Sequence, residues 1–189
     1  MSSDFFWIRK FDEGIIRFAL ADCHLEGDSG AHLALFLNST LEKYEFTSND
    51  TFTEFHDWIN KEVNAHNLSS VMSENEEDNI NVNISLVTVN SLRNTLKIQN
   101  IGNGLILANG ADLLEEVKEL NLTQSFEFET KLDDITHLLL YTNGITEKEI
   151  VSFRQLISSY GEQAMDQIDK DSLKSVDRED DLTLVGFRL

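Results

Sequence analysis

Apolar and polar residues alternate over several short stretches of the chain, as in β-strands with one buried face. Segments 5–10 and 15–22 are both predicted as strands, and the Asp-Glu-Gly sequence at 12–14 between them is typical of a turn. We therefore predict a β-hairpin. An acidic residue stands at the start of its first strand and another at the end of its second, Asp4 and Asp22.

Two stretches have helical spacing instead. Residues 27–44 carry apolar side chains at three- and four-residue intervals, and residues 51–65 place four large apolar side chains on one stripe. Thr51 and Glu54 at the start of the second stretch form a capping-box pattern. Both stretches are predicted to be helices that pack an apolar face on the core.

The rest of the chain contains more strands and then more helices. Further strands are predicted at 80–86, 96–99, 105–108, 126–128, 137–142 and 182–189, and further helices at 147–160 and 162–168. Segment 80–86 alternates as a half-buried strand does, and the acidic stretch within 67–79 indicates an exposed, mobile loop. Because strands and helices occur in separate runs, we expect a layered α+β fold.

Composition narrows the class of protein. A chain of 189 residues suits a single domain, and the formal net charge of −19 disfavours binding to nucleic acids or to anionic membranes. No apolar stretch approaches the roughly 18–20 residues of a membrane span, and residues 1–10 do not resemble a signal peptide. Cys23 is the only cysteine, which fits a reducing compartment. We expect a cytoplasmic protein.

Oxygen-bearing side chains stand at several predicted strand ends and turns. They are Asp4, Asp22, Asn143, Asp180 and Asp181. Carboxylates that converge at one edge of a sheet need neutralising, and Mg²⁺ or Mn²⁺ does this with oxygen ligands. The alternative is that these residues only make turn hydrogen bonds, which is common for Asp and Asn.

Five motifs, in order along nearly the whole chain, resemble those of SpoIIE-like (RsbU-type) PPM serine/threonine phosphatase domains. They are Ser3-Asp4-Phe5-Phe6, Ala21-Asp22-Cys23-His24 followed by Gly27, Asn100-Ile101-Gly102-Asn103-Gly104, the sequence LLYTNGITE at 139–147, and Asp180-Asp181-Leu182-Thr183-Leu184-Val185. The resemblance implies a β-sandwich flanked by helices in α-β-β-α layers. It also implies that 1–189 is one such domain, expected to be the C-terminal part of a longer protein.

The same resemblance implies a site with two Mn²⁺ or Mg²⁺ ions. By position, Asp22 would bridge both ions, and Asp4 would hold one of them together with the backbone carbonyl of Cys23. Asn143 and Asp180 would hold the other, with Asp181 as the second choice in its pair. His24 stands two residues after Asp22, where the eukaryotic branch of the superfamily has a histidine that protonates the leaving group; the alternative is an exposed loop histidine.

The implied activity is removal of phosphate from phosphoserine or phosphothreonine in a partner protein such as a STAS-domain regulator. The sequence leaves open whether the chain forms a homodimer. Two departures from the motifs support an alternative. Asn143 replaces an aspartate and so weakens one metal site, and the turn at 24–30 lacks the Gly-x-Gly pattern. The alternative is a pseudophosphatase that serves as a binding or regulatory module; an unrelated α+β domain with chance motifs is the third reading.

Overall fold

The first hairpin forms as expected and begins a five-stranded sheet. The computed structural model describes residues 4–11, 14–23, 27–44, 52–65, 82–101, 105–108, 111–112, 125–135, 137–142, 147–160 and 183–188. In it, β1 (Asp4–Phe11) and β2 (Ile15–Cys23) are antiparallel. Gly14 in the turn has a φ of +71°, a conformation that glycine adopts without steric cost. Its carbonyl accepts hydrogen bonds from Ser91 N at 3.1 Å and Ser91 Oγ at 2.9 Å, so the turn is tied to the next hairpin.

Three more antiparallel strands complete this sheet. They are β3 (Val82–Asn90), β4 (Thr95–Ile101) and β7 (Ser125–Lys131), and the strand order is β1-β2-β3-β4-β7. The register runs without interruption from β1 to β7. Residues at equivalent positions therefore form straight cross-strand rows on each face of the sheet.

A second sheet has four strands in the order β6-β5-β8-β9. These are β6 (Ala111–Asp112), β5 (Leu105–Ala108), β8 (His137–Tyr141) and β9 (Leu184–Arg188), again antiparallel. A short 3₁₀ turn at Leu132–Asp134 follows β7 and leads towards β8.

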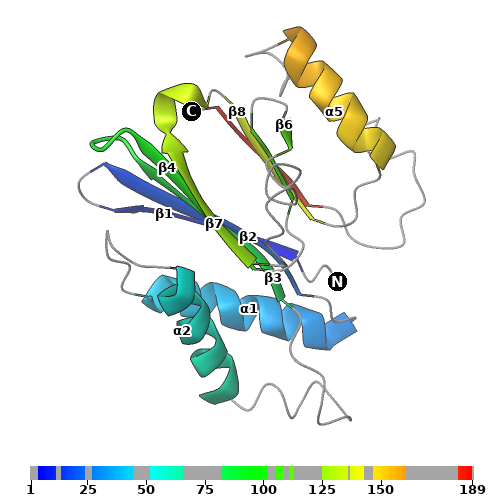
Figure 1. The fold of residues 1–189 in the computed structure, drawn as a ribbon. Coiled ribbons are helices and arrows are strands. Elements are labelled where there is room, and N and C mark those ends of the chain that lie inside the picture. The colour runs from blue at the N-terminus through cyan, green and yellow to red at the C-terminus, as the bar shows by residue number, and fades with distance from the viewer. Residues whose placement is uncertain are drawn as a thin grey trace.

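The two sheets pack face to face around an apolar core. Its buried side chains come from both sheets and the segment between them, namely Phe18, Leu20, Val87, Val89, Leu96, Ile98, Ile135, Leu138 and Leu140. Contact between these residues fixes which side of β2, β3 and β4 faces the sandwich interior. On the opposite face of the first sheet lie α1 (Gly27–Lys43) and α2 (Phe52–Ala65), and α5 (Glu147–Tyr160) lies beyond the second sheet (Figure 1).

The α+β class and the α-β-β-α layers expected from the sequence are thus confirmed. Helix α1 packs its buried face, including Leu33, Leu37 and Leu41, against the sheet together with Phe55 and Ile59 of α2. The C-terminal end of α1 is held to β1 through Glu42. Its carboxylate Oε1 accepts from Trp7 Nε1 at 2.8 Å, and its backbone carbonyl accepts from Arg9 at 2.8 Å.

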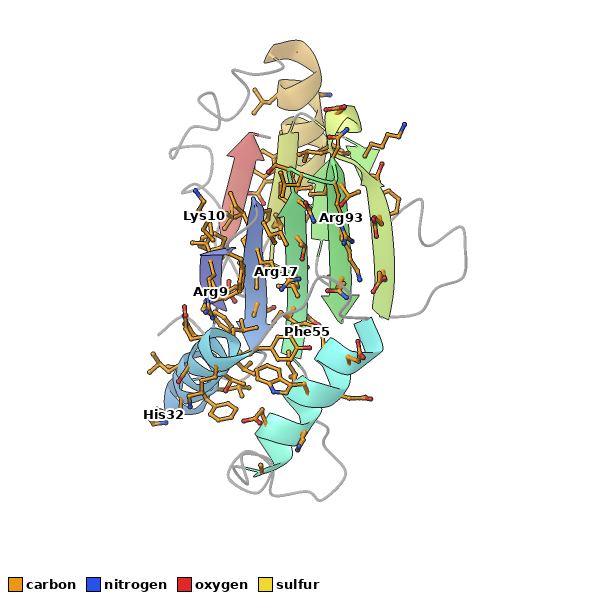
Figure 2. All side chains as sticks on the ribbon, turned by 90° about the vertical axis from the view of Figure 1, so that its left-hand side faces the viewer. Arg9, Lys10, Arg17, His32, Phe55 and Arg93 are labelled. Carbon is orange, nitrogen blue, oxygen red and sulfur yellow. The ribbon has the colours of Figure 1, made fainter. Side chains whose placement is uncertain are left out.

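Beyond the helices, the outer face of the first sheet is polar. Arg9 and Arg17 lie on the neighbouring strands β1 and β2, whereas Phe55 lies where α2 meets the sheet (Figure 2). Both guanidinium groups lie near the ring of Phe11, at 4.9 Å and 5.3 Å from its centroid, and Arg17 Nε donates to Thr88 Oγ1 at 3.1 Å. These contacts account for two like charges standing directly opposite each other in the sheet.

One strand differs from its prediction. The alternation in 80–86 indicated a half-buried strand, but β3 is buried on both faces, and its polar residues Asn83 and Ser85 are only 9% and 3% exposed. The reason is tertiary: the second sheet covers the face on which these two residues lie. The predicted helix at 162–168 and the predicted loop at 67–79 lie outside the described residues. No helix in the described part of the chain is long and apolar enough to cross a membrane.

Candidate metal centre

The open end of the first hairpin brings two carboxylates together. Asp4, the first residue of β1, lies directly opposite Asp22 near the end of β2. Their Cβ atoms are therefore roughly 4.5–5.5 Å apart on the same face of the sheet. Asp22 has the same strand parity as Phe18 and Leu20, so both carboxylates lie on the sandwich side, where Asp22 is 3% exposed. Two carboxylates held this close repel each other unless a cation or donors offset the charge.

Thr142 connects this carboxylate pair to the second sheet. Its Oγ1 donates a hydrogen bond to Asp4 Oδ2 at 2.8 Å and accepts one from Thr183 N at 2.9 Å. The backbone N–H of Thr142 also donates to the carbonyl of Thr183 at 3.1 Å. The C-terminal end of β8 and the residue that precedes β9 therefore meet beside the start of β1.

Three of the predicted metal ligands are close in sequence to Thr142 and Thr183. Asn143 directly follows Thr142 in the sequence, and Asp181 stands two residues before Thr183, with Asp180 before it. These three residues and His24 lie outside the described residues. Their predicted roles stay predictions, as do those of Asp4, Asp22 and the Cys23 carbonyl. Within the described part of the chain, no three His, Cys, Asp or Glu side chains gather as a metal-binding group.

The pKa of the Cys23 thiol is raised by its surroundings. Burial, and to a smaller extent the nearby charges of Asp22 and then Asp4, together raise the pKa of its thiol from an ordinary 9.0 to about 12. The thiol is therefore protonated at neutral pH and is a poor nucleophile.

The structure places three buried polar residues near the carboxylate pair that were not predicted as site residues. Asn83, Ser85 and Asn100 are buried on the sandwich side of β3 and β4. Asn83 lies directly opposite Asp22, and in the next row Ser85 Oγ donates to Asn100 Oδ1 at 2.6 Å. Asn100 begins one of the five motifs, but Asn83 and Ser85 belong to none. The only signal for Asn83 and Ser85 in the sequence was the alternation of polar and apolar residues in 80–86.

The donor chemistry of the described residues fits a hard divalent cation. Asp4 and Asp22 offer carboxylate oxygens, which Mg²⁺ and Mn²⁺ prefer, and a cation would offset the charge of two carboxylates that stand directly opposite each other. Asp4 and Asp22 would hold the cation, with Asn143, Asp180 or Asp181 as further candidate ligands from the adjoining segments.

Comparison with known proteins identifies the fold of this chain but no close relative in sequence. No protein-family model and no curated protein sequence matches this chain. Among solved structures, the chain is similar to the SiaA-PP2C domain of Pseudomonas aeruginosa, with a TM-score of 0.67 at 16% identity; the match covers 100% of this chain and 81% of that one.

Two further structures have the same arrangement. One holds the RsbU and RsbW domains of Rv1364c from Mycobacterium tuberculosis, with a TM-score of 0.65, 15% identity, and coverage of 100% of this chain and 56% of that one. The other is RsbX in complex with magnesium, with a TM-score of 0.61, 14% identity, and coverage of 98% and 86%. The fold of PPM (PP2C) phosphatases, expected from the motifs, is thereby confirmed.

Proposed function

We propose that this chain, which has the fold of PPM-type phosphatases, is a metal-dependent phosphoserine/phosphothreonine protein phosphatase domain of bacterial signalling. The observation that carries the proposal is the opposition of Asp4 and Asp22, with Thr142 bonded to Asp4 from the second sheet. This arrangement joins residues from four of the five motifs at one end of the sandwich: Asp4, Asp22, Thr142 and Thr183.

In this proposal the chain holds two Mn²⁺ or Mg²⁺ ions. Asp22 would bridge them, Asp4 and the Cys23 carbonyl would serve one, and Asn143 with Asp180 or Asp181 would serve the other. When bound, such a pair supplies an activated water nucleophile and neutralises the oxygens of a phosphoryl group. Thr142 fixes the orientation of Asp4. Cys23 stays protonated and does not compete as a nucleophile, and His24 is the candidate acid for the leaving group.

The proposed substrate is a phosphorylated regulatory protein in the cytoplasm. One similar structure belongs to the bacterial stressosome, described as a modular system adapted to control secondary messenger signaling, and another joins RsbU and RsbW domains. These neighbours support a partner protein in a signalling pathway, and we propose a STAS-domain protein as its class. The net charge of −19 argues against nucleic acid as a partner.

A second candidate function follows from Asn143. An amide oxygen can coordinate a hard cation but brings no negative charge, so one metal site has lost part of its attraction. A chain that binds metal too weakly for hydrolysis would act as a pseudophosphatase, with the same fold used as a binding module.

Hydrolysis of p-nitrophenyl phosphate in Mn²⁺ separates the two candidates. The wild type is compared with Asp22→Ala, Asn143→Asp and the control Asp57→Ala, which removes an exposed carboxylate on α2. The phosphatase proposal expects activity in the wild type and the control, none in Asp22→Ala and a gain in Asn143→Asp. Folded wild type with no hydrolysis, together with hydrolysis in Asn143→Asp, would identify a pseudophosphatase. Equal rates in all four proteins would rule out Asp22 as part of the site.

A further inference from the structure

The inner face of the five-stranded sheet changes from apolar to polar next to the carboxylate pair. Away from the pair, the inward side chains of β2, β3 and β4 are Phe18, Leu20, Val87, Val89, Leu96 and Ile98. Nearer the pair, the same faces of the same strands carry Asp22, Asn83, Ser85 and Asn100. Three of these four residues are neutral, so a need for negative charge does not explain why polar side chains stand at this end of the sheet.

These neutral residues are as deeply buried as the core itself. Asn83 is 9% exposed, Ser85 is 3% exposed and Asn100 is fully buried at 0%. A buried amide or hydroxyl without a partner costs about 1–3 kcal/mol, and the Ser85–Asn100 hydrogen bond of 2.6 Å offsets part of this cost. Valine and isoleucine occupy the next inward positions along these strands, so packing of the two sheets does not itself require polar residues here.

The register places Asn83 beside Asp22. Asp22 has Asp4 directly opposite on β1 and Asn83 directly opposite on β3. Directly opposed residues have Cβ atoms roughly 4.5–5.5 Å apart, and Ser85 is at the diagonal position, roughly 7–8 Å away. Within this row, a carboxylate thus stands on one side of Asp22 and an amide with two N–H donors on the other.

We propose that Asn83, supported by the Ser85–Asn100 pair, is a positioning residue that orients the Asp22 carboxylate for a divalent cation. An amide N–H at this position would donate to one oxygen of the Asp22 carboxylate and leave its remaining lone pairs directed away from β3, towards Asp4 and the end of the sandwich. The Ser85–Asn100 hydrogen bond fixes the next row and limits how Asn83 can turn. The inference rests on the proposed function only for the binding of a cation at Asp22, not for hydrolysis.

A purely structural role makes a different prediction for cation binding. If the three polar residues only held the strands together, apolar replacements would destabilise the protein without affecting cation binding. If they position Asp22, apolar replacements would weaken cation binding as well as lower stability, because Asp22 would lose a donor that orients its carboxylate.

The test measures both quantities in the same proteins. Mn²⁺ affinity is measured by isothermal titration calorimetry, and thermal unfolding is measured in EDTA, for wild type, Asn83→Leu and the double variant Ser85→Ala/Asn100→Leu. Gln99→Leu is the matched control, since Gln99 is also a buried amide on β4, adjacent to Asn100, but lies on the other face and donates to Glu127 at 3.0 Å.

We expect Asn83→Leu to raise the Mn²⁺ Kd by roughly 10- to 100-fold, the usual effect of losing a partner of a metal ligand. The double variant should raise it less, and Gln99→Leu should leave it unchanged. Asn83→Ser keeps a hydrogen-bond donor and should lie between wild type and Asn83→Leu; it also serves if Asn83→Leu does not fold.

The outcomes separate this inference from the proposed function. Wild type that binds no Mn²⁺ would overturn both. Wild type that binds Mn²⁺ but hydrolyses nothing, with Asn83→Leu weakened, would support the inference and remove only the phosphatase activity. Equal Mn²⁺ affinity in wild type and in the Asn83 variants would overturn the inference alone, and so would a lower melting temperature in EDTA with unchanged affinity.

Discussion

Thr142 Oγ1 donates a 2.8 Å hydrogen bond to Asp4 Oδ2 across 138 positions of sequence. The bond joins the start of the first sheet to the end of a strand in the second. The same oxygen accepts from Thr183 N at 2.9 Å, so one hydroxyl links three separate segments of the chain. All three segments contain motifs on which the resemblance to PPM phosphatases depends, and the Thr142 side chain makes a hydrogen bond to each of the other two segments.

Replacing Thr142 with valine removes this hydroxyl while keeping the shape of the side chain. The N–H of Thr183 then loses its acceptor and Asp4 loses a donor, so we expect the free energy of unfolding to fall by about 1–3 kcal/mol. Thr142→Ser keeps the hydroxyl and should lose much less. Urea unfolding of the three proteins measures the difference, and equal stability of the two variants would show that the hydrogen bonds contribute nothing.

The opposition of Asp4 and Asp22 predicts a conflict between stability and cation binding. In EDTA, Asp22→Asn removes one of two facing carboxylates, and we expect the metal-free protein to gain roughly 0.2–1 kcal/mol, the usual cost of like charges directly opposite in a sheet. In Mn²⁺ the order should reverse, because only the wild type gains stability from the bound cation. Melting temperatures in EDTA and in Mn²⁺, with Asp57→Asn as the control, measure both effects.

The hairpin and its acidic ends were predictable because the information is local. The turn at 12–14 and the lengths of the two flanking strands are enough to bring Asp4 opposite Asp22. The helices α1 and α2 were predictable for the same reason, since their apolar stripes repeat at helical spacing within each segment.

The interior role of Asn83 and Ser85 was not predictable from β3 itself. Alternation shows that two faces of a strand differ, but not that a second sheet will cover the polar face. The hydrogen bond from Thr142 to Asp4 is also invisible to local patterns, because it depends on how two sheets pack. The motif resemblance placed both segments at one site, yet it could not name threonine as the link between them.

The turn of the first hairpin should be sensitive to any side chain at position 14. A Cβ built on Gly14 would clash with Ser91 Oγ, and a φ of +71° is unfavourable for alanine. We expect Gly14→Ala to lower the free energy of unfolding by about 1–3 kcal/mol, from the clash and the backbone conformation together. Adding Ser91→Ala removes the clash but not the conformational cost, so the double variant should recover only part of the loss. Urea unfolding of both single variants and the double variant tests this non-additivity.

The raised pKa of Cys23 predicts how the metal-free protein responds to alkali. The folded-state pKa is about 12 and the ordinary value is 9.0, so between these pH values the unfolded chain has lost the thiol proton while the folded chain keeps it. The unfolded state then binds fewer protons, and the free energy of unfolding falls as pH rises through this window. Urea unfolding in EDTA from pH 8 to about pH 11 should show this decrease, and Cys23→Ala should lack the part due to the thiol. Iodoacetamide at pH 8 should label Cys23 only in urea. Rapid labelling of the native protein, or identical pH slopes in the two proteins, would show that the thiol is neither buried nor under the influence of the two carboxylates.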